Sequence, residues 1–241
     1  MSWLETLAQV AIHHRTGNSC IAENGFCPSW IADNFNRYVD PFWQHVYLTL
    51  VSVAIGFVLA FAMALVAHRY KRLTGPFVGL SEILYTIPSI AAFLILLPVS
   101  GFGNTTAIIV LSIYAVQSIL SNILLGLRNV PEDLKDAGRG MGLTDRQLLW
   151  RVELPTALPE ILAGLRIAVT TIVGLATLAF FAGGGGLGEQ IYSTKAGTGG
   201  LFFKSNVVVA GGLAVLLAAV GDLLILGGQR AALPWRRVGQ A

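Results

Sequence analysis

Charged residues are scarce in this sequence, and their scarcity excludes several classes of protein. Only 12% of the 241 residues are Asp, Glu, Lys or Arg, and 54% are hydrophobic. Soluble domains carry about 25% charged residues. So little charge and so much apolar surface do not fit a disordered protein, a nucleic-acid-binding protein or an ordinary cytosolic enzyme. The 16 basic residues outnumber the 13 acidic ones only slightly, so the net charge of +3 does not indicate a nucleic acid partner.

Motifs for nucleotide binding and catalysis are also missing. No GxxxxGK[ST] phosphate-binding loop occurs in the sequence, so we expect ATP to be hydrolysed by a partner and not by this chain. The glycine run at 183–188 matches GxGxxG, but it follows an apolar run and not a β-strand. We interpret it as a flexible outer turn leading into a short helix near 188–195. No Ser, His and acid arrangement can be argued from position, so the sequence predicts no enzyme.

Candidate metal ligands and cysteines are few. The four histidines form no metal-binding spacing with Cys, Asp or Glu, so we expect no metal site. The two cysteines, Cys20 and Cys27, both lie within the first 42 residues. A disulfide between them is favoured if this segment lies in an oxidising compartment, and two free thiols are the alternative.

Long apolar runs are what the sequence has in abundance. Five of them are long enough to cross a hydrocarbon layer of about 30 Å as helices, the form that satisfies each backbone amide within its own segment. The runs cover residues 46–67, 77–98, 105–127, 161–181 and 206–228. They lack the polar stripe of soluble amphipathic helices, which argues against the alternative of five buried helices in a large soluble core. We therefore predict an all-α membrane protein with five transmembrane helices.

Basic residues indicate how these helices are oriented. With the N-terminus outside and the C-terminus in the cytoplasm, 12 of the 16 Lys and Arg residues fall on the cytoplasmic side. The positive-inside rule favours this arrangement over its inverse. We expect an external N-terminal extension at 1–42, a membrane domain at 43–229 with a cytoplasmic loop at 128–160, and a basic cytoplasmic tail at 230–241.

The longest polar stretch, at 128–160, is predicted to form two short helices. Pro131 suits a first helical position, and Gly142 suits a left-handed residue at the helix end. The residues at 144–147 have capping-box spacing and begin the second helix, which the Leu-Pro pair at 154–155 is expected to end. Two capped helices indicate a docking surface on the cytoplasmic face, and a solvated loop is the alternative.

The residues at 136–142, followed by the Leu-Pro pair, resemble the cytoplasmic signature of ABC-importer permeases. The resemblance implies a coupling helix that inserts into a cleft on a separate ATPase subunit. The residues that it assigns to this contact are Asp136, Ala137, Gly138, Gly140, Gly142, Leu154 and Pro155. Small residues at 137, 138 and 140 are expected to let the helix approach the other surface closely. The sequence departs from the family at Gly138, where alanine is usual, and glycine lowers helix propensity by about 1 kcal/mol.

The resemblance extends over about residues 40–230. The segments at 81–89, 137–143, 152–165 and 182–188 are similar to permeases for quaternary-amine osmoprotectants such as glycine betaine, choline and carnitine. The similarity implies the type I (MetI-like) ABC importer permease fold in the cell inner membrane. It also implies partners: a second permease subunit, a cytoplasmic ATPase dimer that binds ATP and Mg²⁺, and an external solute-binding protein. No cofactor is expected in this chain itself.

Three ionisable residues lie inside predicted spans, near their cytoplasmic ends: Glu82, Arg166 and Asp222. One hypothesis is that Arg166 pairs with Glu82 or Asp222 at an inward-facing gate. The alternative is that each side chain extends to the lipid headgroups. Pro88 lies mid-span and is expected to kink the second helix, either along the transport path or as an accommodated packing feature.

Aromatic side chains in and near the spans have two interpretations. They can offer their faces to a quaternary ammonium group through cation–π attraction, or they can serve packing, which we favour for most of them. The residues are Tyr85, Phe93, Tyr114, Phe180 and Tyr192.

Other functions remain open for a chain of this kind. A permease of the same fold could carry another solute, such as an amino acid or a metal chelate. A passive channel or a membrane scaffold is a rival from a different class, but neither requires a coupling segment.

Overall fold

A computed structural model describes residues 25–192 and 203–232, and every regular element within these two ranges is helical. In chain order the elements are α3 (Pro28–Asn34), η1 (Phe35–Tyr38), α4 (Val39–Arg69), η2 (Lys71–Leu73), α5 (Thr74–Thr86), α6 (Ser89–Ser100), α7 (Asn104–Arg128), α8 (Glu132–Gly140), α9 (Asp145–Leu148), the π-helical turn η3 (Leu149–Glu153), α10 (Leu154–Ala176), η4 (Thr177–Ala182), α11 (Leu187–Tyr192) and α12 (Lys204–Ala232). The all-α prediction is confirmed.

Four helical stretches are long and apolar enough to cross a membrane: Pro28–Arg69, Asn104–Arg128, Asp145–Ala182 and Lys204–Ala231. A fifth crossing results when α5 and α6 are taken together as one broken span, bent by 98°. The apolar runs were therefore placed correctly. The expectation of one kinked helix over 77–98 is wrong, because the second span consists of two separate helices.

Pro88 explains the break between α5 and α6. Proline has no N–H to donate and disfavours helical geometry in the residue before it. Accordingly Ile87 is extended, with φ −63° and ψ 127°, and Pro88 is the residue that precedes α6. The hydroxyl of Tyr114 on α7 donates a hydrogen bond to the carbonyl oxygen of Ile87. The break thus has a partner for a backbone group that a continuous helix would have satisfied internally.

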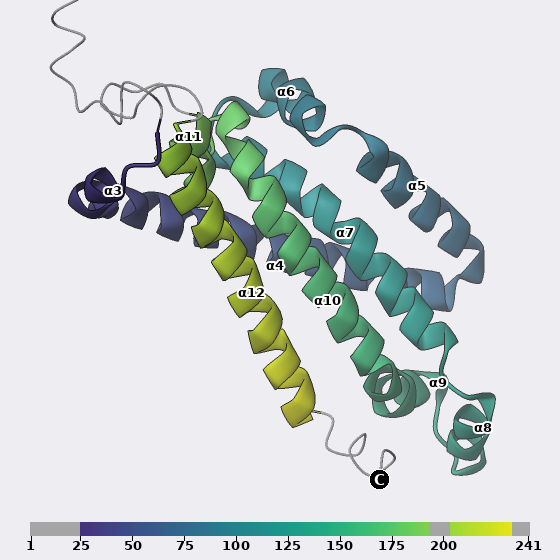
Figure 1. Cartoon of the computed structure of the whole chain (residues 1–241). Helices are drawn as coiled ribbons and strands as arrows, with labels where there is room; N and C mark the ends of the chain where they lie inside the picture. Colours follow the sequence, from purple (N-terminus) through teal and green to yellow (C-terminus); the bar gives the residue numbers. More distant parts are fainter. Residues whose placement is uncertain (1–24, 193–202, 233–241) are drawn as a thin grey trace, which may run out of the picture.

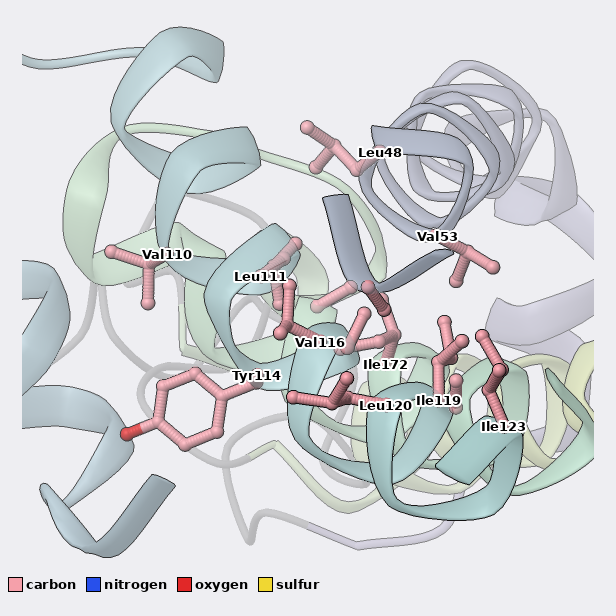
Figure 2. Close-up of a cluster of buried hydrophobic side chains, with 14 of the residues drawn as sticks. Leu48, Val53, Val110, Leu111, Tyr114, Val116, Ile119, Leu120, Ile123 and Ile172 are labelled. Carbon is pink, nitrogen blue, oxygen red and sulfur yellow. The ribbon is translucent and has the colours of Figure 1, made fainter. Parts of the chain in front are cut away.

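α7 lies at the centre of the bundle and packs against α4, α5 and α10 (Figure 1). Its inward side chains, such as Leu111, Ile119 and Ile123, are fully buried and form the middle of the core (Figure 2). The helices approach closely where one of them carries glycine. A Cβ at Gly164 of α10 would lie 2.5 Å from Cβ of Asn122 on α7. Close backbone approach through small residues is how membrane helices gain packing energy without a hydrophobic driving force.

The two ends of the bundle carry different elements (Figure 1). The short helices α8 and α9 lie at the end where α12 also terminates, which we call the α8–α9 end. The helices α3, α6 and α11 lie at the opposite end. This places the polar 128–160 loop and the C-terminal end of α12 on one side of the predicted membrane, as the five-span topology requires.

The helix that begins at α9 does not end at the Leu-Pro pair, contrary to expectation. It runs from Asp145 to Ala182 as one continuous helical stretch that includes η3 and α10. Pro155 lacks the N–H that an α-helix would use there, and its ring would clash with the preceding turn. The π-helical turn immediately before it widens the helix by one residue per turn. The widening lets the helix pass the proline instead of stopping.

The glycine run at 183–186 forms a closely packed turn, not the loose one expected. Gln44 of α4 donates from Nε2 to the Gly184 carbonyl at 2.7 Å and accepts the Gly186 N–H at 3.2 Å. His45 accepts the Leu187 N–H on Nδ1 at 3.4 Å. Gly185 adopts a φ of 66°, and a Cβ there would lie within 2.5 Å of Gln44. The turn therefore requires glycine for both conformation and space.

Part of the expected N-terminal extension packs onto the beginning of α12. The Tyr38 hydroxyl donates to Oδ1 of Asn206 at 2.6 Å, and the Trp30 ring lies edge-on to Phe203 with centroids 5.1 Å apart. The predicted partner of Cys27, which is Cys20, lies outside the described residues, so the disulfide stays a prediction.

Gly188 provides a test of this packing. A Cβ at Gly188 would lie 1.8 Å from the Thr177 carbonyl oxygen, so Gly188→Ala forces backbone to move. We expect a loss of about 1–3 kcal/mol, typical of overpacking, seen as a lower thermal unfolding temperature of the detergent-solubilised protein. The control is Gly174→Ala in α10, which has open space and should be neutral or stabilising by up to about 1 kcal/mol. Equal unfolding temperatures for the two variants would contradict the packing.

Candidate functional site

The α8–α9 end is built from two capped helices. α8 begins with Glu132 and Asp133 after Pro131, which occupies the position before the first helical residue and not the first one. The Glu132 carboxylate accepts a hydrogen bond from the Lys135 ammonium at 2.8 Å, which lowers the pKa of Glu132. Acidic side chains in a first turn also favour the helix dipole.

Gly142 ends α8 as predicted. Its φ is 81°, the left-handed conformation that glycine adopts without strain. The Gly142 N–H bonds the Arg139 carbonyl at 2.9 Å, and the Leu143 N–H bonds the Gly138 carbonyl at 3.1 Å. These two bonds make a Schellman motif.

α9 begins with the predicted capping box. The Thr144 N–H donates to Oε1 of Gln147 at 2.9 Å, and the Thr144 hydroxyl accepts the Gln147 N–H at 3.4 Å. Reciprocal bonds of this kind satisfy two donors that a helix start leaves unpaired. The helix is therefore held at its first turn before it continues into η3.

Small residues on α8 serve two purposes. Gly138 is buried, and a Cβ there would lie 2.6 Å from Cδ1 of Leu148. Its small size therefore lets α8 pack against α9 inside this chain, which differs from the expected approach to another surface. Ala137 and Gly140 are exposed, and Gly140 has open space around it. Those two positions remain available to a partner.

The exposed side of α8 combines charge with apolar atoms. Asp136 and Arg139 form an ion pair at 3.1 Å on the surface. Met141, which directly follows α8, is 74% exposed, whereas Trp150 belongs to η3 and its ring lies beside Phe61 of α4. Leu154, by contrast, belongs to the buried core, and Pro155 is exposed at the beginning of α10. An exposed surface that combines a large apolar side chain with small residues is suited to binding another protein.

A pair of a buried acid and a partly exposed histidine, which the sequence did not reveal, connects this end to α4. Oε2 of Glu153, in the π-helical turn, lies 3.1 Å from Nε2 of His68 in the last turn of α4. Glu153 is 5% exposed, and a buried carboxylate needs a partner. Sequence analysis missed the pair because its members are far apart in the chain and no spacing relates them. The one available signal was the place of Glu153 in the sequence, immediately before the Leu-Pro pair at 154–155.

A charged hollow of about 670 Å³ separates the end of α4 from α8 and α9. Basic side chains lining it include Arg69, Lys71, Lys135, Arg139 and Arg146. This density of charge belongs with water or with a polar partner and not with hydrocarbon.

Two of the three intramembrane charges pair with each other. Arg166 of α10 donates from Nε to Oδ1 of Asp222 at 2.7 Å and from Nη2 to Oδ2 at 2.8 Å. This two-point contact joins α10 to α12. Bidentate geometry is the strong form of an arginine–carboxylate pair. Of the two partners considered for Arg166, the structure has Asp222, and neither side chain extends alone to the headgroups.

Glu82 lies apart from this pair, on α5. It is exposed, and it makes no ion pair or hydrogen bond with the residues that the structure describes. Glu82 is eight residues after Thr74, the first residue of α5, which corresponds to about 12 Å along a helix. Glu82 therefore lies further from the beginning of its helix than its position in the apolar run at 77–98 indicated.

One of the five aromatic residues singled out from the sequence is a core residue, and the other four form ring pairs. Phe93 is fully buried and serves packing. The rings of Phe180 and Tyr192 are stacked with centroids 5.9 Å apart at the α11 end. The rings of Tyr85 and Tyr114 lie 5.5 Å apart at the break between α5 and α6.

Several apolar spans around a central helix, with a capped and charged pair of short helices at one end, define a multi-pass membrane transport subunit. Comparison with known families agrees: the model of the binding-protein-dependent transport system inner membrane component matches residues 31–227. The chain belongs to this family. It is accordingly a multi-pass protein of the inner membrane, from a family of transport subunits whose ATPase activity lies in a partner.

Curated relatives are similar over most of their length. The carnitine transport permease protein OpuCB of Listeria monocytogenes is 32% identical over 192 residues, which are 80% of this chain and 86% of the relative. The choline transport system permease protein OpuBB of Bacillus subtilis is 34% identical over 80% of this chain and 87% of the relative. The osmoprotectant import permease protein OsmW of Salmonella typhimurium is 32% identical over 81% of this chain and 92% of the relative.

Solved structures share the fold. A chain of the MetNI methionine ABC transporter in an inward-facing conformation is 25% identical, with a TM-score of 0.68, over 81% of this chain and 95% of that chain. A chain of an amino acid ABC transporter solved with histidines is 17% identical, with a TM-score of 0.70, over 83% of this chain and 96% of that one. The type I permease fold that the sequence resemblance implied is confirmed.

The pair between α10 and α12 can be tested by exchanging its charges. Arg166→Asp and Asp222→Arg each place two like charges together inside the membrane, which has a high cost. We expect both single variants to lose most of the thermal stability and transport of the wild type. The double variant restores opposite charges and should regain both. The measurements are thermal unfolding in detergent and uptake in vesicles, and a double variant no better than either single one would contradict a direct interaction.

Proposed function

We propose that this chain is the permease subunit of an ATP-driven importer for quaternary-amine osmoprotectants such as glycine betaine, choline and carnitine. The observation that carries the proposal is the similarity to permeases named for carnitine, choline and osmoprotectants, at 32–34% identity over about 80% of the chain. The chain supplies the path through the membrane. A separate ATPase binds ATP and Mg²⁺ and supplies the energy.

The α8–α9 end is the site at which the ATPase docks in this proposal. Its exposed Ala137, Gly140 and Met141 offer a surface that a cleft on another protein can enclose. Asp136 and Arg139 add charge at the rim. Gly142 holds the end of α8 in its Schellman motif. The geometry supports coupling through this surface, and it fits a passive channel or scaffold poorly, since neither needs a docking site.

Helical continuity supports the transmission of movement from this site to the membrane. The helix from Asp145 to Ala182 leads without interruption from α9 into the bundle. The Glu153–His68 pair attaches its π-helical turn to α4, and the Arg166–Asp222 pair attaches α10 to α12. A displacement of α8 by the ATPase therefore moves three membrane helices together in this proposal.

One chain encloses too little to form a solute path alone, so the importer pairs two permease subunits. Two ATPase subunits dock on the two α8–α9 ends in the cytoplasm. A solute-binding protein delivers the solute at the opposite end. The orientation follows the distribution of basic residues, with the 128–160 loop inside.

An amino acid is the second candidate solute. The observation that favours it is the similarity to a chain of the MetNI methionine transporter, with 25% identity and a TM-score of 0.68. The lower identity makes this candidate the weaker one.

Uptake by the complete importer tests the function. The chain is reconstituted in proteoliposomes with its ATPase and its solute-binding protein, and uptake of labelled glycine betaine, choline and carnitine is compared with uptake of methionine and histidine. We expect ATP-dependent uptake of at least one quaternary amine and none of the amino acids. Uptake of an amino acid alone would transfer the assignment to the second candidate.

Gly142→Asp tests the coupling assignment. Aspartate at φ 81° is strained, so the end of α8 should distort and ATP-dependent uptake should fall by about tenfold or more, which corresponds to at least 1.4 kcal/mol. Gly142→Asn should retain more activity, because asparagine adopts the left-handed conformation more readily. Gly75→Asp is the matched control, since Gly75 is exposed with open space at the beginning of α5. Undiminished uptake and ATPase co-purification with Gly142→Asp would show that coupling lies elsewhere.

A further inference from the structure

The break between α5 and α6 lies near the middle of the predicted membrane. Tyr85 is eleven residues after Thr74, which places it about 16 Å along α5, roughly half of a 30 Å hydrocarbon layer. Tyr114 is ten residues after the first residue of the 25-residue helix α7. Discontinuous membrane helices with non-helical backbone at mid-depth occur where protein or a water-filled path surrounds them.

An acidic side chain lies beside the break. Glu82 precedes Tyr85 and Thr86 by three and four residues, so the three side chains share one face of α5. Glu82 is exposed and has no partner among the residues described, and Tyr85 is 41% exposed. An unpaired acid at this depth has a high cost in lipid. This face of α5 therefore borders a polar path.

The end of α5 adds negative charge to the same place. The last carbonyl groups of a helix carry the negative end of its dipole, and cations are stabilised near them. Pro88 prevents the next helix from continuing α5, so the final turn of α5 remains a helix end inside the membrane. The Thr86 hydroxyl bonds the Ile83 carbonyl, and the Tyr114 hydroxyl bonds the Ile87 carbonyl.

The exposed ring of Tyr85 lies beside the acid and packs against the buried ring of Tyr114. The Tyr85 and Tyr114 rings are inclined at 56° with centroids 5.5 Å apart. Figure 2 shows the Tyr114 ring at the edge of the core cluster, with its hydroxyl directed away from the other labelled side chains. Its hydrogen bond to Ile87 holds the ring in this orientation. Tyrosine faces attract cations within about 6 Å of the ring centroid.

We propose that Glu82 and Tyr85, at the end of α5, form a mid-membrane site for the quaternary ammonium group of the passing solute, with the buried Tyr114 ring supporting Tyr85 from α7. This inference rests on the proposed function and names where the solute is recognised within the membrane. A quaternary ammonium has no N–H to donate, so charge and aromatic faces are what can recognise it. The break supplies both, with the exposed carboxylate of Glu82, the C-terminus of α5 and the exposed ring of Tyr85.

The site is tested in the reconstituted importer with choline and glycine betaine as probes. Glu82→Gln removes the charge from an exposed side chain that makes no ion pair or hydrogen bond with the described residues, so the fold should persist. We expect choline uptake per assembled complex to fall by about tenfold, which corresponds to 1.4 kcal/mol. Uptake of glycine betaine should fall less, because its own carboxylate gains from the loss of a neighbouring acid. ATPase activity stimulated by the binding protein should persist, so fewer solute molecules are moved per ATP.

Two substitutions of Tyr85 distinguish the contribution of its aromatic ring from that of its hydroxyl group. Tyr85→Leu removes the aromatic face and should lower uptake of both solutes, whereas Tyr85→Phe keeps the face and should retain it. The matched controls are Asp40→Asn and Tyr47→Leu, an exposed acid and an exposed tyrosine on α4, which should transport as the wild type does.

The outcomes distinguish this site from the proposed function. If the Glu82→Gln and Tyr85→Leu variants both take up choline or glycine betaine at the wild-type rate, the site is overturned and the function is retained. Failure of the wild type to take up any quaternary amine, with an active and assembled complex, overturns the function and the site with it. Selective loss in these two variants, with unchanged controls, supports both.

Discussion

Satisfaction of backbone hydrogen bonds away from water is the constraint on which this structure depends. Hydrocarbon offers no partner for an N–H or a carbonyl group, so the chain crosses as helices. Two of the places where it departs from regular helix are held by side chains from other elements. Tyr114 binds the carbonyl freed by the break at Pro88. Gln44 and His45 bind the turn that contains the glycine run. At both positions tertiary contacts complete the hydrogen bonding of irregular backbone.

The same constraint explains how the molecule can transmit force. Helices that cross a membrane are stiff, and a few polar contacts determine which of them move together. The continuous helix through η3 and α10 joins the α8–α9 end to the core, and the pair of Arg166 with Asp222 joins α10 to α12. The α5–α6 element differs, because it packs chiefly on α7 and carries an exposed acid at its break. A stiff driving unit beside a discontinuous helix is a reasonable arrangement for alternating access.

Local signals in the sequence predicted local structure well. The capping box at Thr144, the left-handed Gly142 and the apolar runs all appear where their patterns placed them. The two prolines were harder to interpret. Pro88 breaks its helix fully, while Pro155 is accommodated in a continuous one. The difference comes from their surroundings: Tyr114 stabilises the break, whereas a π-helical turn makes room for Pro155. Neither neighbour is recognisable from the residues adjacent to the proline.

The sequence by itself determined the class of the protein, because hydrophobicity, charge asymmetry and caps act within segments of about 20 residues. It also restricted the partners of Arg166 to two acids, Glu82 and Asp222. Only the tertiary structure decided between them, paired Glu153 with His68, turned Gly138 inward against Leu148, and brought Tyr85 to Tyr114. Those contacts join residues distant in the chain. They depend on how helices pack and rotate against one another, which no single segment encodes.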